Sequence, residues 1–301
     1  MKRALITGIN GFTGSYVASE LRHSGFDVWG LGSQVSSVVT DQYHQADILD
    51  VSSIAKAIEK VQPNVVVHLA AVAFVAHGDS DAFYNVNLMG TRNLLSAIES
   101  ASRDVDCILI ASSANVYGNS DLGILDESSP VSPANDYAVS KLAMEYMART
   151  WMTKLPIVLA RPFNYTGVGQ SKIFLIPKIV DHFQRKQTQL ELGNIDVSRD
   201  FSDVRTVARI YRRLVEASPV GETINVCSGQ ATSIRELIQL MENISGYDVE
   251  IKVNPAFVRS NEVKQLCGDT QKLTSVIGNY TMPPLEDTLR WMFHARSSMP
   301  V

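Results

Sequence analysis

Tyr137 and Lys141 stand four residues apart, a spacing that puts both side chains on one face of a helix. A phenol with the usual pKa of about 10 exchanges protons poorly at neutral pH, but a neighbouring ammonium favours the phenolate and should bring that pKa below 10. Such a pair can supply the proton when a ketone is reduced. Taken alone, the spacing fits a half-buried tyrosine beside a surface lysine better.

Two serines, Ser112 and Ser113, follow the apolar run at residues 106–111. This run is typical of a central strand, and open α/β sheets place their sites at the carboxyl ends of such strands. A serine hydroxyl there could donate a hydrogen bond to a substrate oxygen on which negative charge develops. Ordinary loop chemistry without a ligand is the alternative.

Three glycines, Gly8, Gly11 and Gly14, follow the first apolar run at residues 4–7. Glycines in such a turn let backbone N–H groups approach a pyrophosphate, and the N-terminus of the next helix adds a favourable partial charge. A glycine-rich turn without a ligand is the alternative. The position of this turn at the first strand–helix junction favours dinucleotide binding.

The end of the second strand bears on the choice between NAD and NADP. No acidic residue stands just after residues 27–31, where NAD-binding proteins place the carboxylate that holds the ribose 2′-OH. Ser33 could instead hydrogen-bond a 2′-phosphate, so the sequence favours NADP(H) and leaves NAD(H) open. Asp47 could accept from the adenine amino group while Ile48 packs on the ring, although a simple loop and cap pair is the alternative.

Apolar runs alternate with helical segments through the first half of the chain, which is typical of crossover units and a parallel sheet. We expect strands at residues 4–7, 27–31, 64–69, 106–111, 157–160 and 223–226, and helices at about residues 52–61, 81–101, 136–153, 174–185, 204–216 and 234–243. Right-handed crossovers then give an α/β fold with a doubly wound parallel Rossmann sheet.

The alternation loosens after Pro162, which predicts a smaller C-terminal α/β lobe for the substrate. The dinucleotide-binding domain is expected at residues 1–164, with a return segment at about residues 203–232. The substrate lobe is expected at residues 165–202 and 233–301.

The composition of the 301 residues excludes several classes of protein. Hydrophobic residues make up 45% and the net charge is −4, so the chain is neither disordered nor strongly basic, and nucleic acid is not an expected partner. Cys107, Cys227 and Cys267 are too far apart along the chain to suggest disulfides or a metal site. Such cysteine usage makes a reducing cytoplasm the default expectation, and no apolar run reaches the ~20 residues of a membrane span.

Five motifs occur in order along the chain: Gly8-x-x-Gly11-Phe12-x-Gly14, His68-Leu69-Ala70-Ala71, Ser112-Ser113-x-x-Val116-Tyr117-Gly118, Tyr137-x-x-x-Lys141 and Arg161-Pro162-Phe163-Asn164. Together they resemble the extended short-chain dehydrogenase/reductase family, whose members act on nucleotide-activated sugars. The resemblance covers about residues 4–290.

The resemblance implies roles for individual residues. It makes Ser113 the active-site hydroxyl, Tyr137 the acid–base residue and Lys141 its partner, with Tyr137 and Lys141 also in contact with the cofactor. The remaining cofactor residues that it implies are Phe12, Ala70 and Ala71, beside the three glycines. Asn87 matches the asparagine that supports the region of the active-site lysine, although a purely structural role explains it equally well.

Two departures and several further segments indicate the branch of the family. Sugar 4,6-dehydratases have an acid two residues before the position of Tyr117, where this chain has Asn115, and an amide cannot act as that base. The cysteine of the fucose-type epimerase–reductases is also missing from this loop. Segments at residues 161–170, 192–204 and 258–269 are similar to those of GDP-mannose dehydratases and their sister reductases, except that Ser260 replaces a proline.

These segments imply the substrate contacts. Arg199 and Arg259 are suited to clamp a diphosphate through paired hydrogen bonds, although an ion pair between lobes is the alternative for each. Asn164 and Glu262 complete the implied set, with Glu262 accepting from a guanine or a ribose.

The resemblance implies NADPH-dependent reduction of the 4-keto group of a GDP-linked 6-deoxyhexose, from GDP-4-keto-6-deoxymannose to GDP-D-rhamnose. Two alternatives stay open: an NAD-dependent 4-epimerase that uses the same three residues, and a cofactor-binding regulator without turnover. The resemblance also implies a homodimer through the helices at residues 81–101 and 136–153, with a fully buried helix in a monomer as the alternative. The second helix carries more apolar side chains than one core face needs: Leu142, Met144, Tyr146, Met147 and Trp151.

Overall fold

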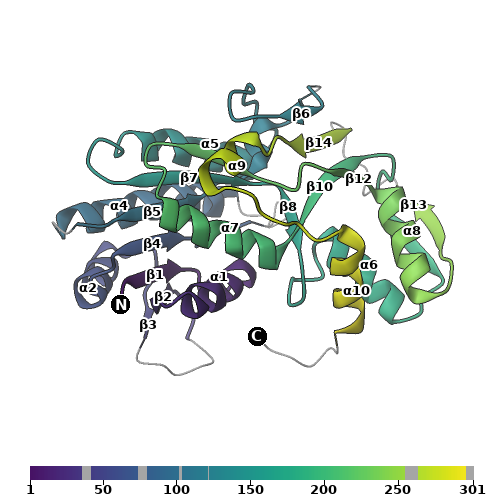
Figure 1. Cartoon of the computed structure of the whole chain (residues 1–301), viewed down its shortest axis with the longest axis horizontal. Coiled ribbons are helices and arrows are strands. Elements are labelled where there is room, and N and C mark those ends of the chain that lie inside the picture. The colour runs from purple at the N-terminus through teal and green to yellow at the C-terminus, as the bar shows by residue number, and fades with distance from the viewer. Residues whose placement is uncertain (36–41, 74–79, 102–103, 121, 255–263, 296–301) are drawn as a thin grey trace.

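Seven parallel strands form the central sheet of the molecule (Figure 1). The computed structural model describes residues 1–35, 42–73, 80–101, 104–120, 122–254 and 264–295. The strands, in their order across the sheet, are β11 (Thr223–Val226), β7 (Ile157–Pro162), β5 (Cys107–Ala111), β4 (Val65–His68), β1 (Arg3–Thr7), β2 (Asp27–Gly32) and β3 (Tyr43–Gln45). The order of strand addition reverses between β1 and β4, as in doubly wound folds, which confirms the predicted fold class.

Helices cover both faces of this sheet. The first face carries α1 (Phe12–His23), α7 (Val204–Ala217) and α9 (Gln271–Ile277), and the second carries α2 (Val51–Val61), α4 (Thr91–Ser100) and α5 (Asp136–Arg149). Successive strand residues point to opposite faces, so Leu5 packs in the second core and Ile6 in the first. Both faces are therefore buried, which explains the near-continuous apolar runs of the strands.

A smaller lobe lies at the right of Figure 1. Its strands are β6 (Ile124–Leu125), β8 (Asn164–Thr166), β9 (Gln189–Leu192), β10 (Ser198–Asp203), β12 (Ala231–Ser233), β13 (Glu250–Val253) and β14 (Gln265–Gly268), and its helices are α6 (Leu175–Gln184), α8 (Ile234–Ser245) and α10 (Leu285–His294). The three helices share one apolar core. The lobe has α and β elements as predicted, whereas the boundaries at residues 164, 202 and 232 stay a prediction.

The two long helices at the site differ from expectation. The segment expected as one helix at residues 81–101 consists of a short α3 (Ser80–Ala82), a π-helical turn η1 (Phe83–Gly90) and α4. The helix expected to end at residue 153 ends at Arg149, where the Thr150 hydroxyl donates to the carbonyl oxygen of Met147 at 2.7 Å. Apolar periodicity does not reveal such local hydrogen bonds, so it overestimates the length of a helix.

One buried carboxylate joins the lobe to the end of the central sheet. Asp200 on β10 is fully buried and accepts from the backbone N–H groups of Ser228 at 2.8 Å and Gly229 at 2.9 Å, and from that of Gly268 at 3.3 Å. The Ser228 hydroxyl donates to it as well, at 2.7 Å. A single side chain therefore connects β10, β14 and the loop that follows β11.

Asp200→Ala should lower the free energy of unfolding by about 3–5 kcal/mol, because three backbone N–H groups would lose a buried, shared acceptor. Urea denaturation measures this loss. Asp196→Ala is the control, since among the described residues the Asp196 carboxylate pairs with Arg235 at an exposed position. Equal stability of the two variants would contradict the role of Asp200.

Candidate active site

The turn between β1 and α1 has the shape that the glycine spacing predicts. Gly8 has a φ of +71°, which side chains rarely adopt, and a Cβ at Gly14 would lie 2.2 Å from the carbonyl oxygen of Gly8. Gly11 is the N-cap of α1 and has no side chain to occupy the first N–H groups of the helix. A cradle of this kind fits the pyrophosphate of a dinucleotide.

A buried chain of hydrogen bonds runs from this turn into the second helical layer. The Thr91 hydroxyl donates to the carbonyl oxygen of Asn87 at 2.6 Å, so its oxygen must accept from Nε2–H of His68 at 2.9 Å. His68 Nδ1 then accepts from the Thr7 hydroxyl at 2.7 Å. The Thr7 oxygen in turn accepts from the N–H of Ala70 at 3.1 Å, which fixes the loop after β4 beside the glycine turn.

Asn87 ties the same loop to helix α5. Its side-chain oxygen accepts from the N–H of Val72 at 2.9 Å, and its amide donates to the carbonyl oxygen of Val72 at 3.1 Å and to Ser140 Oγ at 3.0 Å. The Ser140 hydroxyl donates to the carbonyl oxygen of Tyr137 at 2.8 Å. Asn87 therefore supports the helix next to Lys141 through side-chain contacts to Val72 and Ser140.

The three residues predicted to be catalytic lie together at the ends of β5 and α5. Ser113 is the N-cap of a 3₁₀ turn, η2 (Ala114–Tyr117), and its side chain lies close enough to the Tyr137 phenol to lower the pKa of that phenol. Lys141 is only 5% exposed, and its ammonium donates to the carbonyl oxygen of Ala111 at 2.8 Å. Lys141 is therefore not the surface lysine of the alternative interpretation.

Burial dominates the electrostatics of this cluster. It raises the pKa of Tyr137 to about 12, against the opposing hydrogen bond from Ser113. The expected pKa below 10 is therefore wrong for this structure. Burial also lowers the pKa of Lys141 to about 8, and the carboxylate of Glu145 opposes that shift. At neutral pH the phenol keeps its proton and can donate it, beside an ammonium that is still charged.

The residues expected to bind the adenosine half of the cofactor lie just after β2 and just after β3. Ser33 is exposed just after β2. Asp47 is exposed and accepts from the N–H of Leu49 at 2.9 Å, as in a loop cap. Ile48 is only 6% exposed and packs in the core beside Gly90, which leaves little of it for an adenine ring.

The cofactor turn also contacts the segment that enters the lobe. The Thr13 hydroxyl hydrogen-bonds to the hydroxyl of Tyr165 at 2.7 Å, and the Tyr165 ring stacks on Phe12. The sequence gives no signal for this contact, because 152 residues separate Thr13 from Tyr165. Phe12 therefore lies between the glycine turn and the start of the lobe.

The expected substrate residues are only partly described. The Asn164 amide donates to the carbonyl oxygen of Asp200 at 3.4 Å, and Arg199 donates to the carbonyl oxygen of Ser198 at 2.8 Å. Asn164 and Arg199 lie on neighbouring strands, because β8 pairs with β10. Arg259 and Glu262 fall outside the described residues.

Sequence reasoning missed an ion pair behind the catalytic cluster. Glu145 and Arg161 pair at 2.7 Å in the interior, and Ser112 donates to Glu145 at 2.5 Å. The available signal was the position of Glu145 four residues after Lys141, on the same face of α5.

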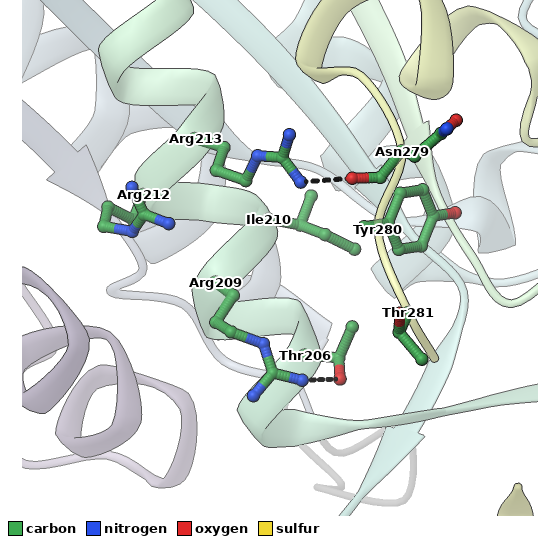
Figure 2. Close-up of a pocket in the computed structure, with 8 residues that line it drawn as sticks. All are labelled: Thr206, Arg209, Ile210, Arg212, Arg213, Asn279, Tyr280 and Thr281. Atoms are coloured by element: carbon green, nitrogen blue, oxygen red, sulfur yellow. Dashed lines mark hydrogen bonds between the residues drawn. The ribbon is translucent and has the colours of Figure 1, made fainter. Parts of the chain in front are cut away.

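A cavity of about 350 Å³ on α7 is separate from this cluster (Figure 2). Its lining residues are Thr206, Arg209, Ile210, Arg212, Arg213, Asn279, Tyr280 and Thr281. Arg212 pairs with Glu20 and Glu216. Arg213 donates to the carbonyl oxygen of Asn279. None of the residues predicted to be catalytic lines this cavity, and its arginines already have partners, so we do not take it as the active site.

Among the described residues, no group of three or more His, Cys, Asp or Glu side chains could hold a metal ion. No helix in the described part of the chain is long and apolar enough to cross a membrane.

Comparison with known proteins identifies relatives along almost the whole chain. The family described as GDP-mannose 4,6 dehydratase matches residues 5–292. GDP-6-deoxy-D-talose 4-dehydrogenase of Aggregatibacter actinomycetemcomitans is 36% identical over 98% of both chains. GDP-6-deoxy-D-mannose reductase of Pseudomonas aeruginosa is 35% identical over 92% of this chain and 91% of the relative.

Two solved structures are also similar to this chain over almost its whole length. A protein of Burkholderia cenocepacia, provisionally described as an epimerase, is 49% identical and superposes with a TM-score of 0.92 over 97% of both chains. The structure of RMD from Pseudomonas aeruginosa in complex with NADPH is 32% identical, with a TM-score of 0.85 over 97% of this chain and 98% of that one.

His68 should be neutral, with its proton on Nε2, and should not titrate between about pH 5 and 8, because burial lowers its pKa to about 3. The pKa of His68 is lower in the folded state than in the unfolded state, so below about pH 6.5 the unfolded state binds a proton that the folded state does not. His68 therefore costs no stability above pH ~6.5 and destabilises the fold as the pH falls below ~6.5. The nitrogen chemical shifts of the His68 ring, followed against pH, measure both which nitrogen carries the proton and whether the ring titrates. A ring that titrates near pH 6.5 would contradict the hydrogen-bond chain.

Proposed function

Because the chain belongs to the GDP-mannose 4,6-dehydratase family of extended short-chain dehydrogenases/reductases, we propose that it reduces the 4-keto group of a GDP-linked 6-deoxyhexose. The observation that carries the proposal is the buried cluster of Ser113, Tyr137 and Lys141 at the carboxyl edge of the sheet, with Asn115 where dehydration needs an acid.

The cofactor that we propose is NADP(H), with NAD(H) as the second candidate. The glycine cradle fits a dinucleotide pyrophosphate, and no carboxylate follows β2 to repel a 2′-phosphate near Ser33. The relative RMD is described in complex with NADPH. When bound, the nicotinamide supplies the hydride for C4 of the sugar.

The side chains of this cluster have distinct roles in the proposed reaction. Tyr137 donates its proton to the C4 oxygen, for which its raised pKa keeps it protonated at neutral pH. Ser113 donates a hydrogen bond to the same oxygen as negative charge develops. The Lys141 ammonium, held on the carbonyl oxygen of Ala111, stabilises that charge and holds the nicotinamide ribose.

The substrate that we propose is GDP-4-keto-6-deoxymannose, with GDP-D-rhamnose as the product. Asn164 and Arg199, on paired strands, are the described side chains proposed to contact it, with Arg259 and Glu262 completing the set. The relative from Aggregatibacter carries the name of a 6-deoxytalose enzyme, so GDP-6-deoxy-D-talose, the C4 epimer, is the alternative product. Which face of the ketone meets the nicotinamide decides between the two.

An NAD-dependent 4-epimerase is the second candidate function. The Burkholderia relative is provisionally described as an epimerase, and an epimerase would use the same three residues. Stoichiometry separates the two functions, because a reductase consumes one NADPH per sugar and an epimerase consumes none. Incubation with GDP-4-keto-6-deoxymannose and NADPH, followed by NMR of the product, tests the proposal.

We also propose a homodimer of the enzyme in the cytoplasm, with no nucleic acid partner. Met89 on η1 and Val139 and Tyr146 on α5 are 40%, 37% and 60% exposed, which leaves apolar surface on the two helices expected at the interface. Met144 is fully buried and belongs to the core face of α5. A dimeric mass by light scattering supports the proposal, and a monomeric mass removes it.

Tyr137→Phe should lower kcat by about 10²–10⁴-fold, which is the usual value of a positioned general acid. Affinity for NADPH and thermal stability should change little, because a single hydroxyl is lost. Steady-state kinetics and cofactor titration measure both effects. Turnover at the wild-type rate would exclude Tyr137 as the proton donor.

Reduction should slow as the pH rises through about 8, because Lys141 loses its proton there while Tyr137 stays protonated to about pH 12. The dependence of kcat/KM on pH measures this decline, the alkaline limb of the pH profile, for the free enzyme. Lys141→Arg keeps its charge at every accessible pH, so its residual activity should lack the limb. A wild-type limb only above pH 10 would instead point to the tyrosine.

A further inference from the structure

A buried ion pair lies directly behind the catalytic cluster. The side chains of Glu145 and Arg161 are 1% and 5% exposed. The guanidinium donates from Nε to Oε1 at 2.9 Å and from Nη2 to Oε2 at 2.7 Å, a paired geometry that only arginine offers. Burial of two charges is costly, and a well-packed apolar pair often replaces them without loss of stability. Stability alone therefore does not account for this pair.

The carboxylate end of the pair reaches the strand that carries the active-site serine. The Ser112 hydroxyl donates to Glu145 Oε1 at 2.5 Å. Ser112 stands between Ala111, whose carbonyl oxygen accepts from Lys141, and Ser113. The hydrogen bond from Ser112 to Glu145 therefore restrains the backbone that carries the Ala111 carbonyl oxygen, which binds Lys141, and the side chain of Ser113.

The guanidinium end of the pair reaches the far end of the turn η2, which follows Ser113. Arg161 Nη1 donates to the Tyr117 hydroxyl at 3.0 Å, and its guanidinium lies 4.9 Å from the centre of the Tyr117 ring. The Tyr117 hydroxyl in turn donates to Asn225 Oδ1 at 2.7 Å. Since η2 begins directly after Ser113 and ends at Tyr117, the ion pair holds the turn at both ends.

We propose that Glu145 is a positioning residue for the reduction, which holds the strand end of Ser113 and the side chain of Lys141 in register with Tyr137. The proposal rests on the proposed function. Tyr137, Lys141 and Glu145 follow one another at four-residue intervals on one face of α5. Glu145 thus acts through its neighbours and is itself too far along the helix to take the place of the acid–base residue.

The charge of Glu145 provides a readout that a packing role would not give. Glu145 on α5 and His68 on β4 interact electrostatically with Lys141, and Glu145 in turn binds Arg161 on β7, which contacts the Tyr117 hydroxyl on η2. Among them, Glu145 is the group that opposes the lowering of the lysine pKa. Its neutralisation should therefore shift the alkaline limb of the reaction to lower pH.

Three variants test the proposal. Glu145→Gln removes the charge and keeps the shape, and Ser112→Ala removes only the link to the strand end. Thr288→Val is the matched control, because the Thr288 hydroxyl donates to another buried carboxylate, Asp203, at 2.8 Å, and that carboxylate also pairs with an arginine. Measurements are kcat and KM against pH, thermal melting, and hydrogen exchange of residues 111–117.

Ser112→Ala and Glu145→Gln should lower kcat by about 10- to 100-fold, the effect of a slightly misplaced catalytic group, while KM changes less than about threefold. Only Glu145→Gln should also move the alkaline limb to lower pH. Thr288→Val should leave kcat and the limb unchanged. Folded Glu145→Gln with the wild-type kcat and limb would overturn the proposal, and if this variant does not fold, wild-type kcat in Ser112→Ala would overturn it.

Failure of the proposed function has a separate signature. It would appear as a wild type that does not reduce the ketone at all. Hydrogen exchange then decides on Glu145 without any turnover: faster exchange of residues 111–117 in Ser112→Ala, but not in Thr288→Val, supports the positioning role. Equal exchange in wild type and Ser112→Ala overturns it.

Discussion

The ion pair between Glu145 and Arg161 joins the parts of the molecule that have to meet at the candidate site. Glu145 belongs to the helix of Tyr137 and Lys141, while Arg161 is the next-to-last residue of β7, three residues before Asn164 at the start of the lobe. The pair therefore connects the sheet, the helix of the proposed acid–base residue and the entrance to the proposed substrate lobe. Separation of the two charges would leave each one uncompensated in the interior, so this junction is rigid.

Burial serves the proposed chemistry in two opposite ways. It keeps the phenol of Tyr137 protonated, as a proton donor requires, and it makes the Lys141 ammonium easier to lose. Glu145 counters the second effect from one helical turn away. On the cofactor side, the neutral His68 links the glycine turn to the π-helical segment without adding a charge beside the lysine.

The sequence predicted six of the seven strands of the central sheet, most of the helices and the candidate catalytic cluster, because apolar periodicity and short motifs record local constraints, whereas it gave no signal for β3. It did not predict the pair of Glu145 with Arg161, or the bond of Tyr117 to Asn225 across 108 residues, since such contacts exist only after the strands are ordered. The pKa of Tyr137 was missed for the same reason: spacing reveals a neighbouring lysine, but not the burial that outweighs it. The π-helical turn at Asn87 likewise depends on hydrogen bonds to distant residues.

The most direct test of the account follows the hydride itself. The enzyme is incubated with GDP-4-keto-6-deoxymannose and labelled NADPH in two separate reactions. In one reaction the NADPH carries deuterium on one face of C4 of the nicotinamide, and in the other it carries deuterium on the opposite face. The account predicts one deuterium at C4 of the product sugar from one of the two labelled cofactors, with an equal amount of NADP⁺. A product sugar without deuterium from either cofactor would contradict it.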